Sequence, residues 1–448
     1  MIARLRSFWL NVNASYWFYP GLFSAIAALA AIGTVWLDRN GFAEWLNNVA
    51  WIQPSRPEGA RTVLTVIAGS MIATAATVFS ITIAAVAYAS GTYGPRLLTN
   101  FMEDKGNQIS LGVFIATFVY ALMVLRVVRS EDERAPSEMD AVATTLPGFT
   151  PQLSLLVATS LALFAVAVLV YFLHHIPASI RINTVLAGIG RRLIHDVRNR
   201  YPTDGEGREP RHQSAGVPVA AIATGYVMII DFDTLDEIAE RHGSTIALKV
   251  RTGDFVHPDV VLVELSGAEP TDAIADDIRD CFSTGGMRTA TQDLEYLIDE
   301  IVEIALRALS PGINDPFTSI TAMHWLSAAM AELSRRDLDR GPEQEDYSWD
   351  RVQPLDDGYE HFLARGFGVI RASAAADALA SQNFLKSLYS AASTCKSDGR
   401  RDVLLEEGRA LLAQARSALE GPSLAELEDR FEKFQAAMAA LGEERRAG

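Results

Sequence analysis

Hydroxyl side chains recur at helical spacing in one apolar stretch, "GSMIATAATVFSITIAAVAYAS", which runs from Gly69 to Ser90. Ser70, Thr74 and Thr77 share one face of a helix, and Ser80 follows them. In a membrane, hydroxyl oxygens can line a path for ions or polar solutes. Small residues four apart also let two helices approach closely, and this packing role is the interpretation that we prefer. The two roles are compatible in an oligomeric channel.

The end of this stretch carries residues suited to couple a membrane to a soluble domain. Pro95 ends a helix because it lacks a backbone N–H, and Arg96 can then meet lipid phosphates. Arg191 and Arg192 belong to a later amphipathic basic segment, "RINTVLAGIGRRLIHDVRNR". We expect this segment either to lie against anionic lipid heads or to pack on its own protein as a stalk helix.

The turn "SPGINDPFTS", at 310–319, is a third candidate site. Asp315 has the residue type and position of a helix N-cap, and Pro316 those of a first helical residue. The preferred interpretation is therefore a rigid elbow between two helices. The alternative is that Ser310, Asn314 and Asp315, with the amides of the helix start, bind a ligand or another subunit.

Positioning these residues requires a membrane part and a soluble part. A helix that spans a bilayer needs about 20 mostly apolar residues. Four stretches meet this requirement, at about 18–37, 63–88, 109–128 and 153–173. The sequence thus predicts a four-helix transmembrane α domain over residues 1–178. The spans contain almost no charge, which argues against an ion-coupled transporter or a proton pump.

The remainder of the chain predicts a cytoplasmic α+β domain. Residues 179–215 form the basic helix and a linker, 216–268 a small β-rich module, and 269–448 a helical part. Strand-like runs occupy Tyr226–Ile230, Thr245–Val250, Phe255–Val256 and Val260–Leu265. In the helix "TATQDLEYLIDEIVEIALRAL", the spacing of Thr289 and Gln292 predicts a capping box. Asp293 and Asp299 are expected on its polar side.

Composition excludes several classes of function. A net charge of −16 argues against general nucleic-acid binding. The two cysteines, Cys281 and Cys395, cannot form a disulfide framework or a cysteine-based metal site, and they fit a reducing compartment. No metalloprotease, nucleophile-elbow or P-loop motif is present, so we expect neither an enzyme nor a bound cofactor. The arginines after the fourth span place both termini in the cytoplasm of a bacterial inner membrane.

Three stretches together carry a resemblance to a known family. They are the second and third spans with the segment that joins them, "TGYVMIIDFDTL" with "RTGDFV", and "TQDLEYLIDEIVEIALRALSPGINDPFTS". They resemble a family of uncharacterised predicted bacterial integral membrane proteins, grouped under a domain of unknown function. The resemblance covers nearly the whole chain and implies an inner-membrane location and a shared architecture. It supplies no activity.

These observations favour an oligomeric, channel-like or transport-related protein with a cytoplasmic regulatory or assembly domain. Its partners would be the lipid bilayer and further copies of the same chain. The alternative is a scaffold or sensor that transports nothing and binds a ligand or a partner through its cytoplasmic domain.

Overall fold

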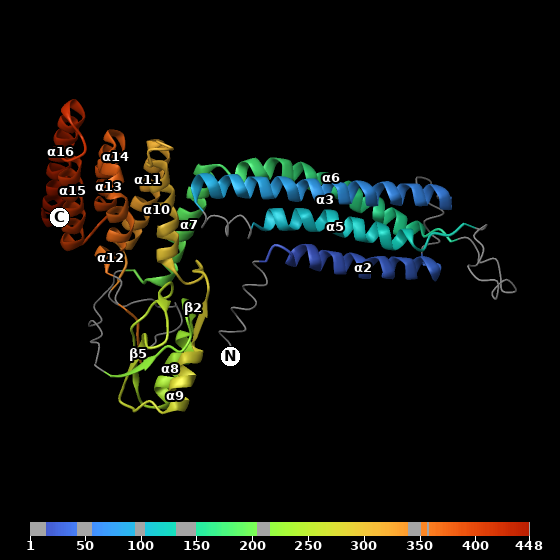
Figure 1. The fold of residues 1–448 in the computed structure, drawn as a ribbon, viewed down its shortest axis with the longest axis horizontal. Coiled ribbons are helices and arrows are strands. Elements are labelled where there is room, and N and C mark those ends of the chain that lie inside the picture. The colour runs from blue at the N-terminus through green and yellow to red at the C-terminus, as the bar shows by residue number, and fades with distance from the viewer. Residues whose placement is uncertain are drawn as a thin grey trace. The chain divides into compact units, whose positions relative to one another are not determined.

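The computed structural model describes residues 15–42, 56–94, 104–130, 149–203, 216–338, 351–355 and 358–447. Pro95 and Arg96, and most of the linker expected before Gly216, lie outside these residues. The chain forms two compact units (Figure 1). The first contains the described residues up to Ile180 except Thr92–Gly94, and the second, called the C-terminal unit below, contains Thr92–Gly94 and the described residues from Arg181 onward.

The first unit contains the expected spans. Its described residues include four helices that are long and apolar enough to cross a membrane. A helix satisfies its own backbone hydrogen bonds, as lipid requires. The central helix is α5, which packs against α2 and α6 and is half buried. The helices are α2 (Phe18–Arg39), α3 (Pro57–Tyr93), α5 (Lys105–Leu125) and α6 (Gln152–Ser179).

Asp38, near the end of α2, caps the start of α6. Its carboxylate accepts hydrogen bonds from the backbone amides of Leu153 and Ser154, each at 2.9 Å, and from the Ser154 hydroxyl at 2.7 Å. The residue that would normally cap α6, Pro151, makes no side-chain cap bond. A side chain from the first span therefore satisfies the free amides at the start of the last one.

At the opposite end of α6, a second polar contact joins α5 to α6. Asp104 caps α5 by accepting from the amide of Asn107 at 3.2 Å. The same carboxylate lies 2.9 Å from Nε2 of His175 on α6. Gly106 lies between them, where a side chain would overlap the His175 ring and the Tyr171 hydroxyl. Polar contacts thus fix both ends of α6 to its neighbours.

The basic segment forms α7 (Ile182–Arg200) and packs on its own protein. Its buried stripe faces α10 (Leu294–Ala308) and α11 (Pro316–Leu333). Trp325 of α11 lies directly against Gly190, where a Cβ atom would overlap its ring. Further along both helices, Arg198 binds Glu332 at 3.0 Å. These pairs show that α7 and α11 run parallel, which agrees with the stalk interpretation.

The β-rich module contains the expected strands and further ones. Strand β2 matches its predicted run within one residue, and β4 matches exactly in its two residues. One sheet has the order β1-β5-β3-β7 and the other β4-β2-β6. Strands β6 and β7 extend the module beyond the predicted range 216–268. The strands are β1 (Val217–Ala220), β2 (Gly225–Ile230), β3 (Thr245–Leu248), β4 (Phe255–Val256), β5 (Val261–Ser266), β6 (Phe282–Gly285) and β7 (Val352–Gln353). Helices α8 (Phe232–Arg241) and α9 (Asp272–Asp280) complete it.

The helical part contains one departure from α geometry. A π-helical turn, η3 (Ala364–Gly368), separates α12 (Tyr359–Leu363) from α13 (Val369–Ala375). Such turns insert an extra residue into a helix and are frequent at functional sites. The remaining helices are α14 (Ala378–Ala392), α15 (Asp398–Ala415) and α16 (Gly421–Ala447).

The predicted capping box at the start of α10 is wrong. The helix begins at Leu294, and its N-cap is Asp293, whose carboxylate accepts from the amide of Tyr296 at 3.0 Å. Gln292 instead binds β2, accepting from the amide of Ile230 at 2.9 Å and donating to its carbonyl. Aspartate is at least as good a cap as threonine, and Gln292 gains two bonds to a strand.

Candidate functional site

The hydroxyl residues of α3 lie mainly on its outward face. We use this name for Gly69, Ser70, Ala73, Thr77, Ser80, Ala84, Ala87 and Gly91, all of which are exposed within the chain. Thr74 is half-buried at its margin. The face that α3 buries in its own bundle is different and carries Leu64, Met71, Ala75 and Val78. Within the part of the chain that the structure describes, the small residues of the outward face therefore do not pack against another helix.

The hydroxyls on this face bond to their own helix. Ser70 donates to the carbonyl of Ile67 at 3.1 Å, Thr77 to that of Ala73 at 3.0 Å, and Ser80 to that of Ala76 at 2.9 Å. A hydroxyl that donates in this way keeps its oxygen lone pairs available. The outward face consequently presents oxygen acceptors and a smooth backbone.

The glycines at the two ends of the outward face have room for a side chain. A Cβ atom on Gly69 or Gly91 would meet nothing within 4 Å. Glycine inside a helix costs about 1 kcal/mol relative to alanine. Helices in membranes use glycine where another backbone comes close.

The two arginines expected to couple membrane and soluble part point differently. Both Arg191 and Arg192 are exposed on α7. Arg191 donates to the carbonyl of Ala187, four residues earlier in its own helix, at 3.0 Å. Arg192 donates to the carbonyl of Ala290 at 3.0 Å, in the segment that leads into α10. Arg192 thus joins the stalk helix α7 to the segment of the same chain that precedes α10.

The elbow between α10 and α11 has the expected cap. Asp315 accepts from the amide of Thr318 at 3.2 Å and from its hydroxyl at 2.6 Å, and Pro316 is the first helical residue. Asn314 has a positive φ of 50° and donates its amide to the carbonyl of Ser310 at 2.9 Å. The three residues thus hold one turn, and the Asn314 side chain is exposed.

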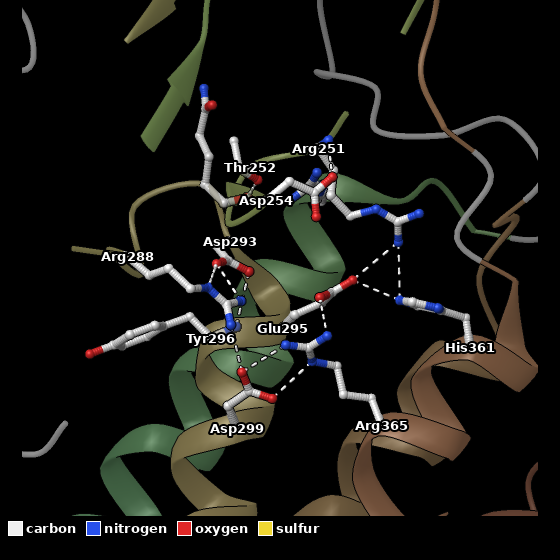
Figure 2. A network of polar contacts seen from close by, with 12 residues as sticks. Arg251, Thr252, Asp254, Arg288, Asp293, Glu295, Tyr296, Asp299, His361 and Arg365 are labelled. Carbon is white, nitrogen blue, oxygen red and sulfur yellow. Dashed lines mark hydrogen bonds and ion pairs between the residues drawn. The ribbon is translucent and has the colours of Figure 1, made fainter. Parts of the chain in front are cut away.

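A buried network of charges surrounds the start of α10 (Figure 2). Asp293 is only 3% exposed and binds Arg288 through Nη2 at 2.6 Å and through Nε at 2.8 Å. Asp299, at the second turn of the helix, also binds Arg288, at 2.6 Å. It binds Arg365 of the π-helical turn through two nitrogens, each at 2.8 Å. Arg288 and Arg365 therefore share one carboxylate.

Glu295 is the second centre of this network. It is 7% exposed, and Arg365 approaches one of its oxygens at 2.6 Å. Its other oxygen lies 2.7 Å from His361 Nε2 and 3.1 Å from Arg251 Nη1 (Figure 2). Burial tends to raise the pKa of Glu295. The hydrogen bond from His361 and the charges of Arg365 and Arg251 outweigh burial and lower that pKa below its ordinary value. Glu295 is thereby held in its ionised form.

The network joins segments that are distant in sequence. Arg251 follows β3, Arg288 follows β6, and His361 and Arg365 belong to α12 and η3. The loop at 251–254 is held against α10 by Thr252, which donates to the carbonyl of Gln292 at 2.9 Å. Because cationic groups occupy the carboxylates, the cluster is suited to hold the β module on the helices. It leaves no carboxylate of the three available as a general base.

The described residues hold no cluster of metal ligands, and the cavity beside the network is small. In the described residues, no group of three or more His, Cys, Asp or Glu side chains could hold a metal ion. A cavity beside the network, near Arg200, Arg251 and Thr252, has a volume of about 10 Å³. That is room for about one water molecule.

The comparison with protein families decides where this chain belongs. A family model described as "Predicted membrane protein (DUF2254)" matches residues 13–390. The chain belongs to this family. The matched residues of the DUF2254 family include all four candidate spans, the outward face of α3 and every residue of the charge network. They end before α15 and α16.

Three similar proteins are described as uncharacterised. Proteins of Mycobacterium bovis and of two strains of Mycobacterium tuberculosis are 31% identical to this chain over 374 residues. The alignment covers 80% of this chain and 68% of each relative. No solved structure matches. Membership of the DUF2254 family therefore establishes a membrane protein and leaves its activity to be argued from the structure.

The sequence predicted the segments that form the network but not the ion pairs between them. The stretches "RTGDFV" and "TQDLEYLIDE" carried the family resemblance, and both contribute to it. Asp293 and Asp299 were expected on the polar side of α10, and the structure adds that two arginines from other segments, Arg288 and Arg365, cover them. The available signal was the density of acidic residues on a helix whose opposite side is already apolar.

Proposed function

We propose that this protein is a homo-oligomeric, channel-like membrane protein in which copies meet along the outward face of α3. The observation that supports it is the exposure of small and hydroxyl residues over six turns, with open space around an added Cβ atom at Gly69. Contact between copies would bury this face, because small residues let two helices approach closely. The soluble unit would assemble or regulate the oligomer.

The chemistry of the face favours cations or neutral polar solutes. Hydroxyl protons on the outward face are donated to the helix, so the oxygens present lone pairs outward. The helix carries no charged residue from Thr62 to Tyr93. A path lined in this way offers acceptors to a cation and no positive charge to an anion.

We also propose a bacterial inner-membrane location with both termini in the cytoplasm. The basic residues of α7 follow directly after the last span, as the positive-inside rule requires of a cytoplasmic segment. Cys281 and Cys395 are buried and not joined in a disulfide, which suits a reducing compartment.

The test is a cysteine scan from Ile67 to Ala89 in the full chain, followed by flux in liposomes. We expect cysteines at Ala73, Thr77 and Ser80 to cross-link between copies or to react with a water-soluble thiol reagent. Ile72→Cys is the matched control, because Ile72 is also exposed but is a large residue adjacent to the outward face. Uniform protection, a monomeric protein and no flux above empty vesicles would together refute the proposal.

One observation favours a second candidate, a membrane-anchored scaffold or sensor. The hydroxyls of the outward face are already bonded to their own helix, so they need no polar path to be satisfied. The exposed Asn314 side chain would then belong to a partner site. Asn314→Gly keeps the positive φ of the backbone and removes the side-chain carboxamide. A defined partner that binds the full chain and is lost with this variant, in the absence of flux, would support the scaffold.

A further inference from the structure

The elbow between α10 and α11 presents exposed apolar side chains on a fixed backbone. Phe317 is 71% exposed and Ile313 is 46% exposed. The turn that carries them is closed by backbone bonds from Ile313 and Asn314 to the carbonyl of Ser310, at 3.0 and 2.9 Å. A third bond joins the amide of Asp315 to the carbonyl of Ala308 at 2.7 Å. These backbone donors are satisfied, so the tip of the elbow can enter an apolar medium without exposing them.

The parallel arrangement of α7 and α11 places this tip along the chain. Trp325 lies on Gly190, and Arg198 binds Glu332 further on. Moving back about two turns from Gly190 along α7 and from Trp325 along α11 brings Ile182 level with Phe317. Ile182 is the first residue of α7, and α6, the last candidate span, ends at Ser179. The elbow therefore lies at the end of the α7–α11 pair where the chain leaves the last span.

We infer that the elbow tip, Ile313 and Phe317, is a membrane-contact surface that inserts into the lipid interface. Exposed aromatic and aliphatic residues are typical of segments that bury an apolar edge at the headgroup boundary. Arg181, exposed at the same end of α7, can bind the phosphates of anionic lipids. The Asp315 carboxylate does not oppose this contact, because the amide and hydroxyl of Thr318 bind it. The inference is independent of whether the protein transports anything.

The experiment attaches an environment-sensitive fluorophore to Phe317→Cys in the full chain. The native Cys281 and Cys395 are buried and do not compete for the label. The matched control is Ala328→Cys, which is also exposed and lies on the same side of α11, three turns from the tip. Both proteins are reconstituted into phosphatidylcholine and phosphatidylglycerol vesicles with and without a doxyl-labelled lipid.

We expect blue-shifted emission at Phe317→Cys and about twofold more quenching by doxyl lipid than at Ala328→Cys, as for a side chain at the headgroup boundary. Replacing Ile313 with Asp in the labelled protein should reduce this quenching. Water-like emission at both positions would overturn the inference, as would equal quenching at both. Blue-shifted emission without lipid quenching would also overturn it, because the tip would then be covered by protein.

Discussion

Gly253 lies so close to Asp293 that a Cβ atom at position 253 would overlap the Asp293 carboxylate. The same glycine has a positive φ of 95°. Two constraints therefore meet in the loop "RTGDFV": the backbone turns in a way that favours glycine, and the loop has to approach the cap of α10. This contact joins the β module to the helical part of the C-terminal unit.

Replacing Gly253 with Ala should therefore destabilise the C-terminal unit. We expect a loss above about 1 kcal/mol, because the new methyl group is both strained and in the way. The control is Gly243→Ala, which also has a positive φ, of 61°, but has nothing within 4 Å of an added Cβ atom. Urea unfolding of the purified protein measures both. Equal losses would show that backbone strain alone matters and that the contact with Asp293 does not.

Removing Glu295 should be among the most costly single changes in the network. Glu295→Ala leaves Arg251 and Arg365 without one of their carboxylates, and breaking a buried ion pair in this way costs about 3–5 kcal/mol. Hydrogen exchange should rise in the loop at 251–254 and in α12. The exposed Glu240→Ala on α8 serves as the control. A loss no greater than that of the control would mean that the network does not stabilise the junction.

The stability of the C-terminal unit should fall in acid because of Glu295. Its pKa in the folded protein is lowered, so its contribution is complete above the ordinary glutamate pKa of about 4.3. The contribution is lost as the pH falls through the lower folded value. The stability difference between the native protein and Glu295→Gln should therefore shrink as the pH is lowered from 6 toward 3. A difference that is constant over this range would contradict the assignment.

The contact between α7 and α11 can be tested at two neighbouring glycines. Gly190→Ala places a methyl group in the Trp325 ring, whereas a Cβ atom on Gly188 meets nothing within 4 Å. We expect Gly190→Ala to destabilise the C-terminal unit by about 1–3 kcal/mol through overpacking. Gly188→Ala should be neutral or slightly stabilising, because alanine is the better helix former. Thermal unfolding of the two proteins distinguishes these outcomes.

Asp38 should be important for the last span. Asp38→Ala removes the cap of α6, and loss of a helix cap costs about 0.5–2 kcal/mol. Asp38→Asn keeps one oxygen acceptor and should lose less. Resistance to unfolding in a detergent series reports both variants. Identical behaviour of the alanine and asparagine proteins would argue that the hydrogen bonds to Leu153 and Ser154 contribute nothing.

Periodicity was enough to predict the elements but not their long-range contacts. The four spans follow from length and apolar composition, and the Asp315 cap follows from local residue order. The start of α10 was misplaced because Thr289, Gln292 and Asp293 are all plausible near a helix start. Only the position of the neighbouring strand β2 decides among them, because Ile230 of this strand bonds both the oxygen and the nitrogen of the Gln292 side-chain amide.

The charge network could not be predicted for the same physical reason. A carboxylate on a helix looks solvated in sequence unless its cationic partner is also known, and Glu295 finds its partners at Arg251 and His361. Likewise, the hydroxyl pattern of α3 was visible in the sequence, but a pattern of small residues does not say on which side the chain's own core lies. The structure places that core at Leu64 and Met71.

The Asp38 cap also bears on the order in which the protein is made. Asp38 emerges from the ribosome 115 residues before Leu153, so the carboxylate enters the membrane system long before the amides that it binds exist. Until then, only water or lipid headgroups can solvate it, which keeps that end of the first helix at the surface of the bilayer. The hydrogen bonds of Asp38 are therefore made only when the last helix is present. In a chain that stops before residue 153, the Asp38 carboxylate would be hydrated instead of bonded to the start of α6.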